Sequence, residues 1–487
     1  MTDYAAIAEE HRLDYGRKVA NYGRILADML YSDRTHFIYE LLQNAEDAGA
    51  DWIAFALFPD RLEVRHNGRP FNEADVRAIC SIGEGTKAED MTKIGKFGIG
   101  FKSVYAHTSS PYIHSASEHF VIVDFVFPQA CNPIEIGAEE TLIAIPFNRG
   151  VDDAQTSYEH IAKRLPSLNS QTLLFLHSVQ EIQWTIVDQQ TGHYLRDTRQ
   201  LAPSVRWVDI LDEQNEGENW LIFASPIDFE DHFLNVEIAF SVETNAKSGQ
   251  QQIRRVNDNK LVVFFPTEKH IRFGFVMQGS YRTTPSRDNI LHDHPLNRTL
   301  IWGTARLISE AIEVLKLQGL LDANALDVFM TEMPLPSNWE FQPIYGAIIE
   351  AFKSKALLPT AGDSFVSGSS AKLARGQDLI SLFDQDQLRL LFPANPSVTW
   401  LHESITRDRF LRLHTFLREQ VKVEEITPEK LIELPTLPHL LSTQGDDWLA
   451  EFYTFLLGQR ALWEYERSPL RAVAFVRLEN GDHVKPF

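Results

Sequence analysis

The stretch IYELLQNAEDAGA, from Ile38 to Ala50, decides the fold of this 487-residue chain. If it is helical, Glu40, Asn44 and Asp47 fall within about 60° of one another, and the apolar side chains share the opposite arc. A polar stripe of this kind usually faces water. The helix alone therefore leaves two interpretations open, a solvated face or the wall of a polar site.

The composition is that of an ordinary folded protein, with 44% hydrophobic and 23% charged residues. Forty-six basic and 67 acidic residues give a formal net charge of −21, so direct binding to nucleic acid or to an anionic membrane is not expected. The start MTDYAAIAEEHRLDYG lacks the basic and apolar segments of a signal peptide, and no apolar run is long enough to span a membrane. We expect a cytoplasmic protein without a membrane segment.

The order of the expected elements predicts an α+β fold. Helices are expected over residues 1–50, and then the strands DWIAFALF and LEVRH, the second closed by Asn67-Gly68. A short helix NEADVRAICSIG, a stretch rich in glycine and lysine, and the strands HFVIVDFVF and ETLIAIPF come next. Because neighbouring strands follow one another directly, we expect a largely antiparallel sheet with helices on one face.

Three regions are predicted, with boundaries at 1–160, 161–320 and 321–487. The second contains the strands EIQWTIVD, WLIFAS, NVEIAFSV, KLVVFFPT and RFGFVMQ and the helix LIWGTARLISEAIEVLKL. The third is mostly helical with proline-containing loops, and near its end two apolar runs flank Asn480-Gly481, which predicts a hairpin. This last element suggests that the sequence is part of a longer protein.

The stretch GKFGIGFKS, from Gly95 to Ser103, places three glycines before an expected helix. Bare backbone N–H groups at a helix start suit phosphate oxygens. Two common nucleotide motifs nevertheless do not fit. A P-loop needs lysine directly after the last glycine, where this chain has Phe101, and a Rossmann motif needs a preceding strand, where this chain has a polar loop.

The ordered combination of motifs resembles the GHKL (Bergerat-fold) ATPases. The likeness covers about residues 30–147 and consists of E-x-x-x-N-x-x-D-A on a helix, an N-G turn after a strand, G-x-x-G-x-G-F before a helix, and ETLIAIPF. Within that superfamily, RTHFIYELLQNAEDAGA and FGIGFKSVY are most similar to sacsin-type, heat-shock-chaperone-like proteins of bacteria. The resemblance implies a GHKL α/β sandwich, followed by a transducer-like α+β domain and a mostly helical region.

The resemblance also implies ATP and Mg²⁺ as cofactors. The family's glutamate matching Glu40 activates the water that attacks the γ-phosphate, and the asparagine matching Asn44 supplies an oxygen to Mg²⁺. Asp47 would support the metal shell or the waters beside adenine. Arg287, in TTPSRDNI, matches an arginine that reaches the γ-phosphate from the adjoining domain. The alternative for Arg287 is an interdomain salt bridge.

The other implied cofactor-binding residues belong to a lid over the phosphates and to the adenine side. The lid residues are Gly83, Thr86, Lys87, Gly95, Lys96, Phe97, Gly98, Ile99, Gly100 and Phe101. The adenine side comprises Thr141 and the turn His66-Asn67-Gly68. Many family members carry aspartate in this turn. Here a nitrogen of His66 or the amide oxygen of Asn67 would have to accept the hydrogen bond from the adenine amino group.

Two functions follow from these patterns. The first is Mg²⁺-dependent ATP binding with slow hydrolysis that drives lid closure and domain rearrangement in a chaperone-like machine, with anti-phage defence as a setting that the bacterial relatives suggest. The second is a nucleotide-gated binding or dimerisation module with little or no hydrolysis, which the altered turn favours and Glu40 disfavours. Expected partners are a second copy of the chain, bound through the N-terminal segment, and an unknown protein or C-terminal effector domain.

Overall fold

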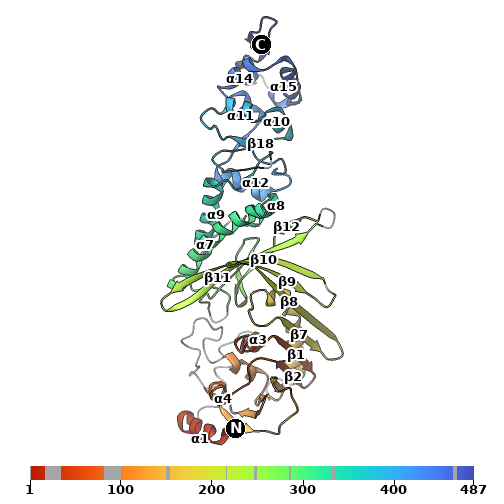
Figure 1. Cartoon of the computed structure of the whole chain (residues 1–487), viewed down its shortest axis with the longest axis vertical. Coiled ribbons are helices and arrows are strands. Elements are labelled where there is room, and N and C mark those ends of the chain that lie inside the picture. The colour runs from red at the N-terminus through yellow and green to blue at the C-terminus, as the bar shows by residue number, and fades with distance from the viewer. Residues whose placement is uncertain are drawn as a thin grey trace. The chain divides into compact units, whose positions relative to one another are not determined.

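The computed structural model of the chain describes residues 2–16, 35–81, 100–149, 154–214, 216–245, 249–284, 287–331, 335–362, 364–463 and 469–486. The chain divides into two compact units (Figure 1). The first unit consists of Met1–Glu243, Asp258–Ile271 and Phe275–Leu307, and the second of Thr244–Asn257, Arg272–Gly274 and Ile308–Phe487.

One large sheet is the framework of the first unit. Its strands lie in the order β14-β13-β15-β11-β10-β9-β8-β7-β1-β2-β6-β3-β4-β5. Their bounds are β1 Trp52–Phe58, β2 Arg61–His66, β3 Tyr112–Ser115, β4 Glu118–Val123, β5 Phe127–Ala130, β6 Thr141–Pro146, β7 Glu181–Ile186, β8 Gln190–Ala202, β9 Val205–Leu211, β10 Gly217–Phe229, β11 His232–Thr244, β13 Lys260–Val263, β14 Phe265–His270 and β15 Val276–Gly279. Buried and partly exposed positions alternate along β1 and β2, so one face of these strands forms the core.

The strand β1 joins the two halves of this sheet. It pairs antiparallel with β2 on one side and parallel with β7 on the other, where Trp52 lies opposite Glu181. The sheet is therefore continuous across residue 160. The predicted region boundaries at residues 160 and 320 remain predictions.

Helices of the first unit position the candidate site. They are α1 Tyr4–Tyr15, α3 Phe37–Asp47, α4 Glu73–Cys80, the 3₁₀ helix η2 Gly100–Ala106, α5 Ala154–Arg164, η3 Leu165–Ser167 and α6 Ser170–Leu173, and α7 Pro295–Leu317 begins in this unit. The apolar side of α3 is fully buried at Ile38, Leu42 and Ala45, so burial of this arc holds the helix in the core. Asn72 caps α4 by accepting hydrogen bonds from the backbone N–H groups of Ala74 and Asp75.

The second unit combines short helices with short strands. Its helices are α8 Ala323–Val328, α9 Gln342–Ser354, α10 Gln377–Leu382, α11 Gln385–Leu391, α12 Leu411–Phe416, η4 Leu417–Val421, α13 Pro428–Ile432, α14 Leu437–Thr443, α15 Asp446–Gly458, α16 Arg460–Trp463 and η5 Pro469–Ala472. Its strands are β12 Gln251–Arg254, β16 Leu358–Pro359, β17 Phe365–Val366, β18 Ala371–Ala374, β19 Thr399–Trp400, β20 Glu424–Ile426, β21 Val476–Arg477 and β22 His483–Val484. The hairpin predicted around Asn480-Gly481 is confirmed, because β21 and β22 pair antiparallel and Gly481 has a φ of 88°.

The predicted α+β class is confirmed, with two kinds of local difference. Two predicted strands are each divided in two where the backbone enters the left-handed region, at Asp124 and Phe125 (φ 48° and 72°) and at Phe264 (φ 62°). The strands β8 and β9 were not predicted; much of β8 is exposed and polar, whereas β9 is largely buried. Among the helices that the structure describes, none has the length and apolar character needed to cross a membrane.

Candidate functional site

The helix α3 presents the predicted polar stripe at the surface of the core. Glu40, Asn44 and Asp47 are all partly exposed. The side chain of Glu40 is 14% exposed, and its Oε1 lies 3.2 Å from Nε2 of His36, one turn earlier. Sequence reasoning missed His36, although a histidine four residues before a glutamate is a recognisable helical pair. An imidazole in this position can orient the Glu40 carboxylate.

His66 ends β2 in a buried position. Its Nδ1 accepts a hydrogen bond from the backbone N–H of Gly68 at 3.1 Å. Burial lowers the pKa of His66 to about 4, so the ring is neutral near pH 7. A neutral ring with an accepting Nδ1 carries its proton on Nε2, and His66 is therefore a hydrogen-bond donor toward any further group.

Asn67 is used within the protein. Its Oδ1 accepts hydrogen bonds from the backbone N–H groups of Asp51 at 2.9 Å and Trp52 at 3.1 Å, and its Nδ2 donates to the Asp51 carboxylate at 3.2 Å. The side chain thereby fixes the start of β1 against the end of β2. Both acceptors that the sequence offers for an adenine amino group, in His66 and Asn67, thus already accept bonds from the protein's own backbone.

Gly68 brings this turn against the C-terminal end of α3. A Cβ at position 68 would lie 2.8 Å from Cβ of Ala48 and 3.1 Å from its carbonyl oxygen, so no larger residue fits without movement. The next N–H, of Arg69, donates to the Ala48 carbonyl at 2.8 Å. The structure therefore places the His66-Asn67-Gly68 turn beside the end of the helix that carries the polar stripe.

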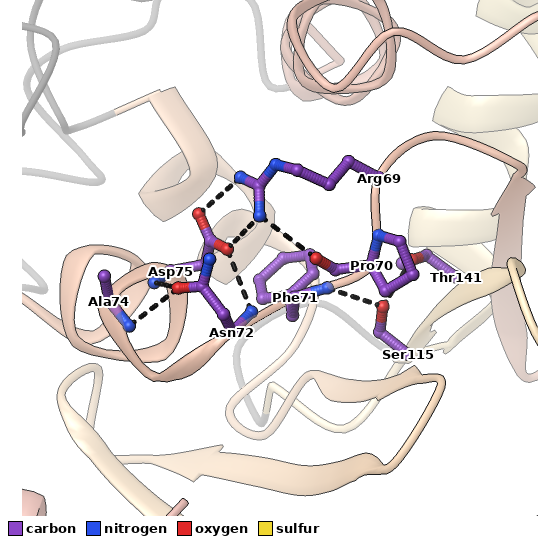
Figure 2. A network of polar contacts seen from close by, with 8 residues as sticks. All are labelled: Arg69, Pro70, Phe71, Asn72, Ala74, Asp75, Ser115 and Thr141. Carbon is purple, nitrogen blue, oxygen red and sulfur yellow. Dashed lines mark hydrogen bonds and ion pairs between the residues drawn. The ribbon is translucent and has the colours of Figure 1, made fainter.

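Thr141 lies directly opposite His66, on the neighbouring strand β6. It is fully buried, and its Oγ1 is 2.6 Å from Oγ of Ser115 on β3. Ser115 Oγ also accepts a hydrogen bond from the backbone N–H of Phe71 at 3.0 Å, as Figure 2 shows. Thr141, which was predicted to lie on the adenine side, is thus buried within the sheet next to the turn, where its hydroxyl contacts Ser115.

A second set of contacts fixes the loop after the turn (Figure 2). The Arg69 guanidinium donates to both carboxylate oxygens of Asp75, at 2.7 and 2.9 Å, and to the Pro70 carbonyl at 3.1 Å. The Asp75 carboxylate also accepts the backbone N–H of Asn72, which completes the cap of α4. These contacts hold the path from β2 to α4, the helix that precedes the glycine-rich stretch.

Most predicted lid residues lie outside the described residues: Gly83, Thr86, Lys87, Gly95, Lys96, Phe97, Gly98 and Ile99. Gly100 begins η2, and Phe101 is buried. Lys102, another cation of this stretch, is buried and donates to the carbonyls of Ile79 and Phe125. Burial lowers its pKa to about 8, and the lysine serves the packing of η2 against α4.

Arg287 lies beside the turn between β13 and β14. Its guanidinium donates to the carbonyls of Val263 at 2.7 Å and Phe265 at 3.1 Å, which flank the turn between β13 and β14. The ring of Phe265 lies 5.1 Å from that of Tyr39, the neighbour of Glu40. Arg287 is therefore connected to α3 through this turn.

Sequence reasoning also missed Glu46, a polar residue on another face of α3. The Glu46 carboxylate is buried and accepts hydrogen bonds from the backbone N–H groups of His177 at 2.6 Å, Ser178 at 3.0 Å and Val179 at 2.8 Å. No local sequence signal reveals this contact, because its partners lie more than a hundred residues away.

Comparison with known proteins agrees with the sequence pattern. Residues 64–163 match the sacsin domain model, a range that includes the His66 turn, the glycine cluster and Thr141 but not α3. Protein NO VEIN of Arabidopsis thaliana is 24% identical over 473 residues, which cover 88% of this chain and 17% of that protein. Sacsin of Homo sapiens is 34% identical over 129 residues, which cover 23% of this chain and 3% of that protein.

The chain thus spans less than a fifth of the length of these curated relatives. A solved structure described as the N terminal domain of a DNA repair protein is 11% identical, with 55% of this chain and 91% of that chain covered. Its TM-score of 0.36 is too low to support an argument. The resemblance to sacsin-type proteins that the sequence predicts is confirmed by the match of residues 64–163 to the sacsin domain model and by the two curated relatives.

Proposed function

We propose that the first unit binds ATP with Mg²⁺ in the manner of GHKL proteins and hydrolyses it slowly. One observation supports this most: the partly exposed stripe of α3 ends where the His66-Asn67-Gly68 turn packs against Ala48. A carboxylate, an amide and a second carboxylate thereby lie on the helix that adjoins the predicted base-binding turn. The sacsin-type match over this turn and the following glycine cluster agrees with the proposal.

Glu40 is the proposed general base. Its carboxylate is mostly but not fully buried, and His36 lies within hydrogen-bonding reach of Oε1. A positioned carboxylate of modest basicity suits phosphoryl transfer, where the protein mainly orients the attacking water. His36 would hold one carboxylate oxygen, so that the other faces the water.

Asn44 is the proposed magnesium ligand. It follows Glu40 by one turn and is partly exposed, and Asp47 follows it on the same stripe. Amide and carboxylate oxygens are the donors that Mg²⁺ accepts, so these residues fit the ion. When bound, Mg²⁺ would offset the negative charge of the phosphates.

Base recognition would differ from that of relatives with aspartate in the turn. Because Nδ1 of His66 already accepts from Gly68, the ring offers Nε2–H, which would donate to a purine ring nitrogen. The buried Thr141 and Ser115 would support this turn from below.

A nucleotide-gated module with little hydrolysis remains the second candidate. Two observations favour it: the acceptors of the turn are used internally, and Arg287 donates to backbone carbonyls. A role in a chaperone-like or defence machine, and dimerisation through the N-terminal segment, are further proposals. In this chain, α1 contacts its own sheet, since Tyr4 donates to Glu118 and His11 Nδ1 lies 2.8 Å from the Val126 carbonyl oxygen.

The experiment compares phosphate release from ATP and Mg²⁺ by the wild-type chain and by Glu40→Ala, with ATP binding to both measured by calorimetry. Hydrolysis by the wild type and binding without hydrolysis by the variant is the result that we expect. Binding without hydrolysis by either protein would favour the gated module. No binding of ATP by the wild type would overturn both candidates.

A further inference from the structure

The buried stripe of α3 consists of Tyr39, Gln43 and Glu46. These side chains lie within about 60° of one another and are 7%, 3% and 8% exposed. The stripe is rotated by about 100° from the centre of the Glu40, Asn44 and Asp47 stripe. One short helix therefore has two polar faces with different surroundings.

Tyr39 and Glu46 of the buried stripe contact the part of the chain after residue 160. The Tyr39 ring lies 5.0 Å from the guanidinium carbon of Arg164, at the end of α5, and 5.1 Å from the ring of Phe265, at the start of β14. Glu46 binds the backbone of residues 177–179, just before β7. These contacts attach α3 to the second half of the sheet.

Glu46 is a strong anchor for chemical reasons. A carboxylate that accepts several backbone N–H bonds in a buried position makes charge-assisted bonds, which are shorter and stronger than neutral ones. All three N–H groups belong to consecutive residues, so the carboxylate fixes the conformation of the whole segment 177–179. Movement of α3 along or across its axis must therefore move this segment or break these bonds.

Arg196, on β8, holds the same segment from the sheet. Its guanidinium donates to the carbonyl of His177 at 3.1 Å and to that of Leu173 at 3.3 Å. Burial lowers the pKa of Arg196 to about 10, while the negative charge of Glu46 acts in the opposite direction. Glu46 and Arg196 thus hold residues 173–179 between the helix and the sheet.

Beyond Arg196, further buried polar groups lie on the strands of the sheet. Arg206 on β9 donates to Oε1 of Glu237 on β11 at 2.5 Å, and Glu237 lies opposite Gln278 on β15. Within the part of the chain that the structure describes, four buried atoms of this group have no hydrogen-bond partner: Arg196 Nε, Arg206 Nη2, Glu237 Oε2 and Gln278 Oε1. Buried polar atoms are nearly always bonded, so these side chains have unused bonding capacity in this arrangement. A small shift of the strands can therefore give these atoms new partners.

We propose that Glu46 is a positioning residue that links the occupancy of the nucleotide site to the arrangement of β8 and β9, through residues 173–179 and Arg196. This inference rests on the proposed function, because the nucleotide is the ligand whose binding is transmitted. Glu46 does not touch the nucleotide. It holds the helix that carries Glu40 and Asn44 to residues 177–179, so that a ligand bound at the site limits the opening of β8 and β9.

The test is hydrogen exchange of the full chain with and without ATP and Mg²⁺, for the wild type, Glu46→Gln and Glu118→Gln. Glu118 is the matched control, because it is also a buried glutamate, but it accepts bonds from Thr2 and Tyr4 near α1. In the wild type and the control, ATP should slow exchange in residues 173–179 and 190–211. In Glu46→Gln, the ATP dissociation constant should change less than about threefold. The factor by which ATP slows amide exchange in residues 190–211 should be at least about tenfold smaller than in the wild type.

Full slowing in residues 190–211 of Glu46→Gln would overturn the inference and leave the proposed function standing. Equal loss in Glu118→Gln would also overturn it, since the effect would then be general loosening. Absence of ATP binding by the wild type, measured by calorimetry, would overturn the proposed function and this inference together. If Glu46→Gln fails to fold, Arg196→Lys carries the same expectation, because it keeps the charge and loses the fork that spans two carbonyls.

Discussion

The two polar stripes of α3 differ in what they contact. Glu40, Asn44 and Asp47 are partly exposed, and their role depends on a ligand. Tyr39 and Glu46 are buried, and they contact the protein itself. The comparison teaches that polar residues on a helix do not by themselves distinguish a ligand-binding surface from a face that packs within the protein. Burial and the identity of the partners separate them.

The largest expected difference between the stripes is in stability. Glu46→Ala removes a charged acceptor from three backbone N–H groups and leaves Arg196 with less compensation, so the free energy of unfolding should fall by about 3 kcal/mol. Glu40→Ala should change it by about 0.5 kcal/mol or less. Urea unfolding of both variants measures the difference. Equal destabilisation would show that both stripes are structural.

The pH dependence of stability tests the burial of His66, which lies in the turn beside α3. The pKa of His66 is about 4 in the folded chain, against an ordinary value near 6.5, because of burial. Between these values the unfolded chain binds a proton that the folded chain does not. The shifted pKa of His66 therefore has little effect on the free energy of unfolding above pH 6.5. As the pH falls below that value it lowers this free energy, by about 2 kcal/mol at pH 5.

The measurement for His66 is the urea midpoint at pH 7 and pH 5 for the wild type and His66→Asn. We expect the wild type to lose about 2 kcal/mol more than the variant over this interval. Parallel losses in the two proteins would mean that His66 is not buried in solution, and the structure of the turn would have to be revised.

A smaller effect is expected from His36. Replacement by alanine should lower ATP hydrolysis about tenfold with little change in ATP affinity, because the histidine orients Glu40 and does not bind the nucleotide. His193 provides the control, since its Nε2 lies 2.8 Å from Glu181 in a His–Glu pair on β7 and β8. His193→Ala should leave hydrolysis unchanged. A loss of affinity in His36→Ala would place His36 among the binding residues instead.

The smallest effect is expected from the surface pair beside the turn. The side chains of Arg69 and Asp75 are 56% and 28% exposed, and those of Arg206 and Glu237 are 14% and 2% exposed. A double-mutant cycle on Arg69 and Asp75 should give a coupling energy below about 1 kcal/mol. The same cycle on Arg206 and Glu237 should give a larger value, because burial weakens solvent screening. Equal couplings would contradict the different burial of the two pairs.

Much of the local structure was predictable from the sequence. The predicted strands DWIAFALF and LEVRH correspond to β1 and β2, and the predicted helices around IYELLQNAEDAGA and LIWGTARLISEAIEVLKL correspond to α3 and α7. These signals are local. The strand β8 was not predicted, because its pairing with β7 and β9, and not an apolar pattern, makes it a strand.

The candidate site was predictable only in part. The family resemblance pointed to Glu40, Asn44 and the His66 turn, whose roles stay predictions, and the register of β2 and β6 places Thr141 opposite His66. The sequence could not indicate that Asn67 binds the start of β1, or that Arg287 binds the turn between β13 and β14. Such contacts depend on segments that only the tertiary fold brings together.

The parallel pairing of β1 with β7 has a consequence for biosynthesis. One edge of β1 is covered as soon as β2 emerges from the ribosome, but the other edge stays open until residues 181–186 have been made. An open, apolar strand edge is a template for association with other chains. A fragment limited to residues 64–163, the range that matches the sacsin domain model, contains only residues 64–66 of β2 and neither of the strands β1 and β7. Such a fragment should aggregate rather than fold, and the unit that folds must extend beyond the range by which the family is recognised.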